Sequence, residues 1–440
     1  MKRQWMVALT ILGAVLFTGS ALHVFAAGEH PSIDQPIMGE QRVTVQRELD
    51  PLTPRQTGQP AAPSSGCEDG DQDSGARYRI CMPSEGDWNG DLVVYAHGYV
   101  APDRPVEIPE DQMSLPGYPW TIDQIVTGMD YGFATTSYYT NGLAVLPALS
   151  DLLDLVDVFT TTQGLIPDRV YLVGVSEGGL ITALSVEQHP DVYDGGLALC
   201  GPYGDFGDQI NHYGDFRVVF DYFFPDLMPG EPLSIPASLM EEWERGFFTE
   251  TIEPKITDPA NTMSVTELLA VTGVSPYEHA PPTSTESIEK LLWYNVFATN
   301  DGVAKLGGRP FDNQDRSYTG SSGDARLNAE VERFSADQAA LDEIAAHYQT
   351  TGQLSVPLIT LHTTGDEGVP YRHAVRYRGK TIVADNIALH EHVRVERHGH
   401  CNFTAEEMLG AFATLVSMVE NPPEYRPVSR AFLPCVVRAP

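Results

Sequence analysis

The sequence predicts an α/β protein in which a mostly parallel central sheet is flanked by helices and interrupted by a mainly helical insertion. Short β-rich segments alternate with helical segments from residue 77 to about residue 204, and the alternation returns from about residue 352. Strands that alternate with helices in this way build parallel sheets. The segment RVYLVGV (residues 169–175) is a continuous apolar run, typical of a strand buried on both faces. Between about 205 and 345 the alternation stops, and helix-like and aromatic-rich segments replace it.

The N-terminus has the pattern of a signal peptide. Lys2 and Arg3 precede an apolar run from Met6 to about Phe17, and small residues follow, ending in Val-Phe-Ala at Ala26. A basic start, a short apolar run and a small-x-small motif are typical of a secretory signal. We therefore expect cleavage near Ala26 and a secreted protein, extracellular or periplasmic. A transmembrane anchor is the less favoured alternative, because polar residues interrupt the apolar run, and no stable membrane anchor is expected.

The rest of the chain divides by composition. Residues 27–75 lack a sustained apolar period and are rich in Pro, Gln, Gly, Ser and Asp, which is typical of a flexible linker. Residues 76–204 and 346–440 carry the alternating pattern and are predicted to form the core. Residues 205–345 are predicted to form a cap or lid inserted into that core.

The elements of the core are expected in chain order from their patterns. Alternating or continuous β-rich runs predict strands, and apolar residues at helical spacing predict helices. The predicted strands cover residues 77–83, 91–98, 131–139, 169–175, 194–201, 357–365 and 391–397. The predicted helices cover residues 121–129, 144–161, 177–189 and 404–419.

Composition excludes some functions. The chain has 60 acidic and 27 basic residues, and no cluster of Lys and Arg that could follow a phosphate backbone. Nucleic-acid binding is therefore not expected. The strong negative charge indicates high solubility and says nothing about the fold.

The five cysteines are an odd number, so at least one thiol is expected to be unpaired within the chain. Export would make disulfides possible. Cys67 and Cys81 are near one another in sequence and are candidates for a bond at the start of the core. The pairing of Cys200, Cys401 and Cys435 stays open at this point.

The motif with the clearest chemistry is Gly174-Val-Ser176-Glu-Gly178. It follows a predicted buried strand and opens a predicted helix, which is the context of a nucleophile elbow. A serine on a tight strand-to-helix turn needs glycines around it, because side chains there would collide with neighbouring elements. The turn exposes the hydroxyl, and the start of the helix offers free N–H groups to a developing anion. We therefore predict that Ser176 is a catalytic nucleophile.

At this motif the sequence resembles the α/β-hydrolase superfamily, and in particular secreted bacterial serine esterases with an inserted cap. The resemblance covers roughly residues 77–204 and 352–420 and implies the chain order serine, acid, histidine. It implies that Asp366, just after the strand PLITLHTTG, is the acid that orients the histidine. The neighbouring Glu367 is the alternative acid, and a turn-forming role for Asp366 before Gly and Pro is the non-catalytic one.

Two histidines follow the last predicted strand. Gly399 lets the chain turn away from the strand, so His400 is better placed than His398 to reach a serine on another strand. We therefore predict that His400 is the general base. Tannases and related feruloyl esterases bond a cysteine after the histidine to one before the serine, but the residue before Ser176 is valine. The partner of Cys401 stays undecided between Cys200 and Cys435.

An oxyanion hole needs two N–H donors. One is expected to be the backbone N–H of Glu177, directly after the nucleophile. By resemblance to His-Gly-x loops of esterases, the other is the N–H of Tyr99 in YAHGYVA, residues 95–101.

No metal and no cofactor are expected. His398, His400 and Cys401 are adjacent residues of types that bind zinc, but no Cys-x-x-Cys or His-Glu-x-x-His completes a site. The whole pattern predicts a secreted serine hydrolase that cleaves small-molecule or polymeric carboxylic esters with a Ser-His-Asp triad. A secreted serine peptidase of the same superfamily is the main alternative, and a non-catalytic binding protein on this fold is the other.

Overall fold

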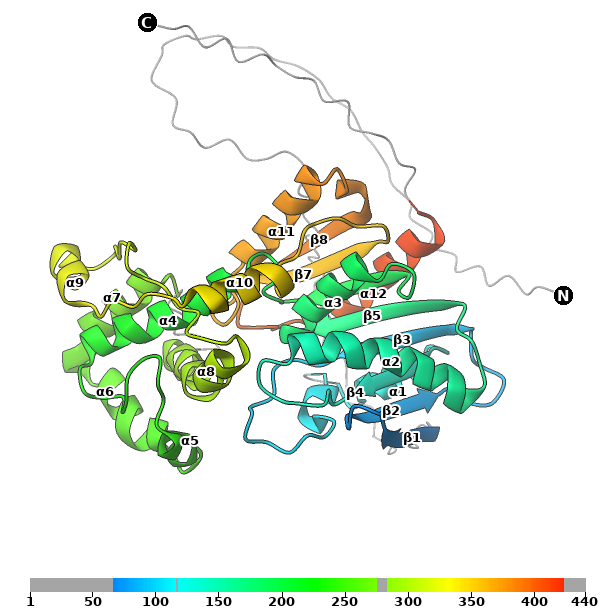
Figure 1. The fold of residues 1–440 in the computed structure, drawn as a ribbon, viewed down its shortest axis with the longest axis horizontal. Helices are drawn as coiled ribbons and strands as arrows, with labels where there is room; N and C mark the ends of the chain where they lie inside the picture. The colour runs from blue at the N-terminus through cyan, green and yellow to red at the C-terminus, as the bar shows by residue number, and fades with distance from the viewer. Residues whose placement is uncertain (1–65, 116–117, 275–282, 423–440) are drawn as a thin grey trace, which may run out of the picture. The chain divides into compact units, whose positions relative to one another are not determined.

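A computed structural model describes residues 66–115, 118–274 and 283–422, which form a central sheet, its flanking helices and a set of inserted helices (Figure 1). The described residues contain one eight-stranded sheet with the strand order β1-β2-β4-β3-β5-β6-β7-β8. β1 and β2 pair antiparallel with their neighbours, and all pairings from β4 to β8 are parallel. The strands are β1 (Gly66–Asp71), β2 (Arg77–Met82), β3 (Asp91–Ala96), β4 (Gly132–Thr136), β5 (Arg169–Val175), β6 (Gly195–Leu199), β7 (Leu358–Gly365) and β8 (His390–His398).

This is the α/β-hydrolase fold. An antiparallel edge leads into a parallel sheet, and the connections between parallel strands run through helices, as the alternating sequence pattern predicts. The flanking helices are α1 (Ile122–Thr127), α2 (Val145–Gln163), α3 (Glu177–Gln188), α11 (Arg372–Val383) and α12 (Ala405–Glu420). The predicted strands and helices of the core are confirmed, with small differences at their ends.

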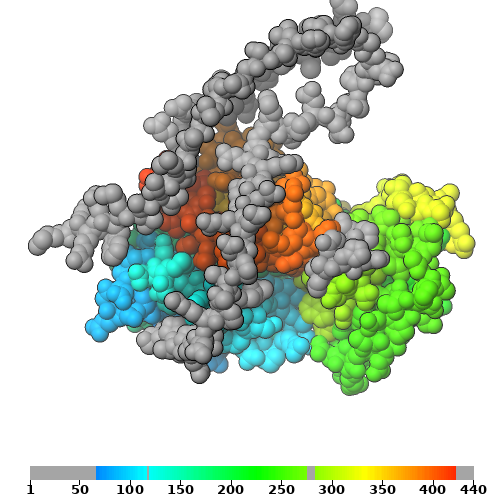
Figure 2. Space-filling view, turned by 180° about the vertical axis from the view of Figure 1, so that it is seen from behind, coloured from blue at the N-terminus to red at the C-terminus, as the bar shows by residue number. Residues whose placement is uncertain are grey.

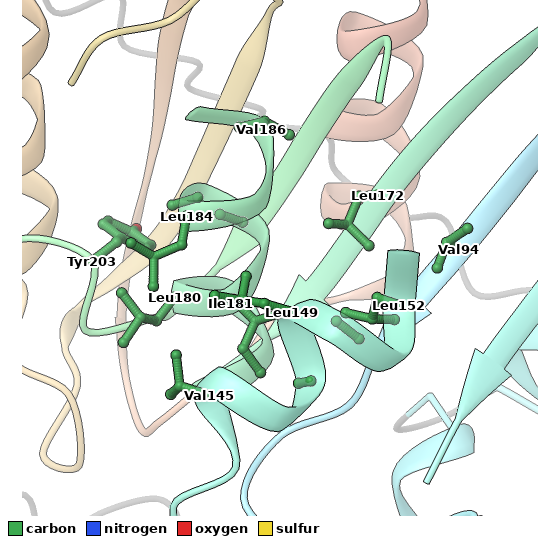
Figure 3. Packing of buried hydrophobic residues seen from close by; sticks show 14 of the residues in the cluster. Val94, Val145, Leu149, Leu152, Leu172, Leu180, Ile181, Leu184, Val186 and Tyr203 are labelled. Carbon is green, nitrogen blue, oxygen red and sulfur yellow. The ribbon is translucent and has the colours of Figure 1, made fainter. Parts of the chain in front are cut away.

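The sheet is buried on both faces. Every residue of β3, β4 and β6 is buried, which explains why these strands read as continuous apolar or small-residue runs. On one face α2 and α3 cover the sheet: Leu149 and Leu152 of α2 and Ile181 of α3 gather against Val94 and Leu172 of the strands (Figure 3). On the other face α1 and α12 supply the cover.

A run of helices is inserted between β6 and β7. It comprises α4 (Phe206–Phe223), α5 (Ala237–Glu244), α6 (Glu253–Ile256), α7 (Thr262–Thr272), α8 (Ser284–Lys305), α9 (Asp324–Glu330) and α10 (Gln338–His347). Short helical turns of other types occur at Glu110–Met113, Phe248–Ile252, Pro259–Asn261 and Ile387–Leu389. Helices α4 to α9, here called the inserted helices, share a hydrophobic cluster of their own, whereas Ala340 and Ile344 of α10 pack into the core of the sheet.

A buried arginine joins the two longest of the inserted helices. The Arg217 side chain of α4 is fully buried and donates to Asp221 at 2.9 Å and to Asn295 of α8 at 2.6 Å. A buried guanidinium is tolerated only when its N–H groups are paired in this way. The hydrogen bond from Arg217 to Asn295 therefore holds α4 against α8, the helix that reaches the candidate site.

The expected linker ends earlier than the sequence indicated. Residues 66–71, placed in the linker on composition, form the edge strand β1, so this part of the prediction is wrong. The strand is almost entirely exposed, and polar contacts hold it: the Cys67–Cys81 disulfide, and Arg79 paired with Asp69 at 2.8 Å. Apolar patterning could not reveal a strand that buries so little. The Cys67–Cys81 bond itself is confirmed.

Some predictions fall outside the described residues. The signal peptide (residues 1–26), the linker up to residue 65 and Cys435 all do so. In the part of the chain that the structure describes, no helix has the length and apolar character needed to cross a bilayer.

Candidate active site

Ser176 lies on the turn between β5 and α3, at the carboxyl end of the sheet. Its backbone has φ 59° and ψ −118°, in the left-handed half of conformational space that serine rarely adopts. The turn is held because the Ser176 N–H donates to Leu199 O of β6 at 2.9 Å. A strained residue kept in place by its neighbours is typical of a functional position.

The two glycines around Ser176 are required by close backbone approaches. A Cβ at Gly174 would lie 2.0 Å from the carbonyl oxygen of Gly178. A Cβ at Gly178 would lie 2.0 Å from the carbonyl oxygen of Ala96, at the end of β3. Any larger residue at either position would push β5, α3 or β3 apart. The structure thus supplies the steric reason for the glycines of the motif.

Ser176, His400 and Asp366 form one chain of hydrogen bonds. His400 Nε2 lies 2.7 Å from Ser176 Oγ, and its Nδ1 lies 3.0 and 2.9 Å from the two carboxylate oxygens of Asp366. An ionised carboxylate can only accept, so Nδ1 carries the proton of a neutral His400 and Nε2 accepts from the serine hydroxyl. The arrangement can take a proton from Ser176 and stabilise the resulting imidazolium.

Asp366 is kept ionised by its neighbours. Burial alone would raise the pKa of its carboxyl, but His400 and His362 beside it and the Val369 N–H, which donates at 2.7 Å, lower the pKa below its ordinary value. His362 Nε2 lies 2.8 Å from Val369 O and 3.5 Å from Asp366. This network fixes the direction in which the carboxylate faces His400.

The two alternative residues lie elsewhere. Glu367 Oε1 accepts from Lys290 Nζ of α8 at 2.8 Å and from the His400 backbone N–H at 3.4 Å, and no interaction joins it to the His400 ring. His398 is the last residue of β8, and its Nδ1 would lie 2.5 Å from a Cβ placed on Gly365. The histidine ring that meets Ser176 is thus that of His400.

The loop after β3 passes directly beside Ser176. A Cβ at Gly98 would lie 3.2 Å from Ser176 Cβ and 3.1 Å from Gln112 Oε1, so a larger residue would crowd the serine. Gln112 holds this loop from outside: its Oε1 accepts the Gly98 N–H at 2.8 Å and its Nε2 donates to Tyr99 O at 3.1 Å. No sequence signal pointed to Gln112. Among the described residues, the N–H groups of Tyr99 and Glu177 have no hydrogen-bond acceptor.

A disulfide joins the turn that carries His400 to the strand beside the nucleophile. Cys401 is bonded to Cys200, at the end of β6, with their Cα atoms 5.4 Å apart. Cys401 Sγ also lies 3.3 Å from His400 Nε2. Of the two partners left open for Cys401, the structure selects Cys200. Because both sulfurs are in the bond, Cys200, Cys401 and His400 offer no thiolate to a metal although they lie close together.

Aromatic side chains of the inserted helices lie over the site. The Tyr99 ring meets Trp293 and Tyr294 of α8 edge to face at 6.0 and 5.9 Å, and its hydroxyl donates to Phe297 O at 3.1 Å. Burial raises the pKa of the Tyr294 hydroxyl, with Asp366 and other acids adding to it and a hydrogen bond with Ser176 opposing it. Tyr294 thus brings a hydroxyl from an inserted helix to the candidate nucleophile.

Glu177 places a titratable group directly after the candidate nucleophile. Its side chain is buried, its Oε1 accepts the Ala144 N–H at 3.0 Å, and its Oε2 has no partner among the described residues. Burial raises the pKa of this carboxyl to about 8, while the Ala144 N–H and Lys305 oppose the shift. The carboxyl is therefore neutral at pH 7 and becomes charged as the pH rises through 8.

Replacing Glu177 with glutamine should extend ester turnover to higher pH. Above about pH 8 the wild type gains a buried negative charge near the point where a substrate carbonyl becomes an oxyanion, and the two charges repel. We expect wild-type kcat/KM to fall on the alkaline side with an apparent pKa of about 8. The kcat/KM of Glu177→Gln should stay level to higher pH. Rates between about pH 6 and about pH 10 measure this.

Stability should show the same titration. The folded pKa of about 8 lies above the ordinary value of 4.5, so the folded protein keeps a proton that the unfolded chain loses between these pH values. Wild-type stability therefore falls relative to Glu177→Gln as pH rises through this window, and Tm measurements would detect it. Glu187→Gln on the same helix is the control. If kcat/KM falls equally at alkaline pH in wild type and in Glu177→Gln, the prediction is contradicted.

The family model of the prolyl oligopeptidase family matches residues 140–207, the part of the chain that holds α2, β5, Ser176, α3 and β6. A search of curated proteins finds no match.

Solved structures that align with this chain, all with TM-scores below 0.5, include both peptidases and esterases. An acylaminoacyl peptidase in complex with Z-Gly-Gly-Phe-chloromethyl ketone aligns with a TM-score of 0.41 at 10% identity, over 81% of this chain and 41% of that one. Est1E from Butyrivibrio proteoclasticus aligns with a TM-score of 0.35 at 15% identity, over 81% of this chain and 98% of that one. The esterase LipA from Xanthomonas oryzae aligns with a TM-score of 0.41 at 11% identity, over 81% of this chain and 88% of that one. This chain thus spans about two fifths of the acylaminoacyl peptidase.

Proposed function

We propose that this chain, a serine hydrolase of the α/β-hydrolase superfamily, is a secreted enzyme that cleaves carboxylic esters through an acyl-enzyme on Ser176. The observation that carries the proposal is the hydrogen-bond chain from Ser176 through His400 to Asp366. Nothing in this chemistry requires a cofactor. Two disulfides support export, because such bonds persist in oxidising compartments.

In the first half of the reaction Ser176 Oγ attacks the ester carbonyl carbon. His400 Nε2 takes the hydroxyl proton as the new C–O bond forms, and Asp366 stabilises the imidazolium. The tetrahedral intermediate collapses when the bond to the alcohol oxygen breaks and His400 returns the proton to that oxygen. The alcohol leaves, and the acyl group stays on Ser176.

In the second half water replaces the alcohol. His400 takes a proton from the water, whose oxygen attacks the acyl carbon, and Ser176 recovers its proton when the acid is released. In both halves the carbonyl oxygen becomes negative and lies between the N–H groups of Tyr99 and Glu177. Each N–H is expected to be worth about 10²–10³ in rate.

The surroundings of Ser176 favour a neutral, partly apolar substrate. Tyr99, Trp293 and Tyr294 present aromatic rings above the serine, which suits an apolar or aromatic group of an ester. A specific observation also favours peptide cleavage as the second candidate. Glu286 and Glu289 of α8 lie around one hollow together with Lys290, Trp293 and Tyr294. Lys290 is paired with Glu367 at 2.8 Å, which leaves the two carboxylates to suit a substrate amine.

Comparing two substrate classes tests the proposal. A p-nitrophenyl ester and an aminoacyl p-nitroanilide release the same kind of chromogenic group, so kcat/KM values can be compared directly. We expect the ester to be turned over and the anilide to be hydrolysed far more slowly. If the anilide is the better substrate and Glu289→Gln slows only its hydrolysis, the peptidase is correct and the esterase proposal is overturned.

A further inference from the structure

A cavity of about 260 Å³ lies on the face of the sheet that α1 and α12 cover. Figure 2 shows this side of the molecule, with α1 in cyan and α12 in red. The cavity wall is formed by side chains of β3, β5, β6 and the two helices, and nearly all of them are apolar. No Asp, Glu, Lys, Arg or His is among the described residues that line it. A charged ligand would find no opposite charge among these residues.

The cavity is an unusual feature in a folded core. Apolar side chains that face each other across the sheet normally fill the space between them, and each unfilled volume costs stability. Here Ile122 and Ile125 of α1 and Met408 and Leu409 of α12 are only half-buried although they face the same core. Space of this size lined by apolar groups is typical of a ligand pocket.

The sheet wall of the cavity leads toward Ser176. Val93 of β3 pairs with Tyr171 of β5, and Tyr171 lies four residues before Val175 in the same strand. Since a strand rises about 3.3 Å per residue, the wall from Val93 to Val175 is about 13 Å long. Val175 is the residue before Ser176, so the cavity runs from the middle of the sheet to the edge that carries the serine.

The end of the cavity nearest the serine is built by residues that touch the reacting groups. Cys401 lines it, and Cys401 Sγ lies 3.3 Å from His400 Nε2, the nitrogen that faces Ser176. Gln112 also lines it, and its amide holds Gly98 and Tyr99 of the loop beside the serine. This end of the cavity is thus lined by the sequence neighbours of Ser176 and His400, Val175 and Cys401.

We propose that this cavity binds the acyl chain of the substrate and that the acyl chain is a medium-length, unbranched alkyl group. The inference rests on the proposed ester hydrolysis and names its substrate class. An apolar space without a charged group, extended along the strands and ending at Val175 and Cys401 beside the catalytic residues, fits an alkyl chain whose carbonyl lies at the serine. The aromatic rings of α8 then face the alcohol part of the ester.

A series of p-nitrophenyl esters from acetate to dodecanoate tests the proposal. Burying one methylene is worth about 0.8 kcal/mol, so kcat/KM should rise about fourfold per methylene until the chain fills the cavity, and then level off or fall. The variants Ile125→Trp and Met408→Trp fill the cavity from opposite helices. Each should move the optimum to shorter chains and lower the ratio of dodecanoate to acetate kcat/KM relative to wild type.

Ala413→Trp is the matched control, because Ala413 is exposed on α12 and does not line the cavity. It should leave the chain-length profile unchanged. Two variants on different helices keep the test valid if one of them fails to fold.

The outcomes separate the two proposals. If wild type hydrolyses none of the esters, the proposed function fails. If it hydrolyses acetate but gains nothing from longer chains, or if both tryptophan variants keep the wild-type profile, the acyl-pocket inference fails alone.

Discussion

Replacing Ser176 with alanine should lower ester turnover by at least about 10⁴-fold. The reason is that Ser176 Oγ is the only atom proposed to bond to the substrate, and it lies 2.7 Å from the His400 nitrogen that would take its proton. Without it, the remaining groups can only bind the ester and polarise its carbonyl, which leaves a small residual rate. The measurement is kcat with a p-nitrophenyl ester, together with labelling by a fluorophosphonate probe, which reacts with an activated serine.

Wild type should take up the probe, and Ser176→Ala should not. Ser185→Ala is a matched control on the same helix: the Ser185 side chain is buried, and its hydroxyl has no hydrogen-bond partner among the described residues. Removing an unpaired buried hydroxyl costs little, so Ser185→Ala should fold, be labelled and keep its activity. An unlabelled, inactive wild type would instead support a non-catalytic binding protein on this fold.

Replacing His400 with alanine should lower kcat by a similar factor, on the order of 10⁴ or more. Ser176 keeps its hydroxyl in this variant but loses the group that removes its proton, and Asp366 is left as a buried carboxylate without the imidazole that lowers its pKa. The loss of that partner should also lower Tm. Ester turnover and thermal unfolding of the same preparation measure the two effects.

His398→Ala is the matched control for this prediction, because the two histidines are separated by one glycine. The His398 ring lies against Gly365 of β7, away from Ser176 Oγ, so the variant should keep most of the activity. Added imidazole should restore part of the activity of His400→Ala by taking over the proton transfer. If His398→Ala is the inactive variant, the assigned roles of the two histidines are reversed.

The order of the core elements was predictable because its signals are local. Runs of β-branched residues, helical spacing and turn residues occur within single segments, and the predicted strands and helices are confirmed in order. The nucleophile turn was also visible, because the steric need for Gly174 and Gly178 arises within a few residues of Ser176. The one error at the start of the core, β1, concerns a strand that buries almost no apolar side chain.

The sequence by itself determined the fold class and the turn at Ser176. It also limited the catalytic acid to Asp366 or Glu367 and the base to His400 or His398. Only the tertiary structure decided between them. His400 meets Ser176 across 224 positions, Cys401 takes Cys200 rather than Cys435, and Gln112 supports the loop at Gly98. The apolar cavity beside Ser176 also has no local signature. Spacing along the chain carries no information about such pairs, because packing of the strands and helices sets which distant side chains come within bonding distance.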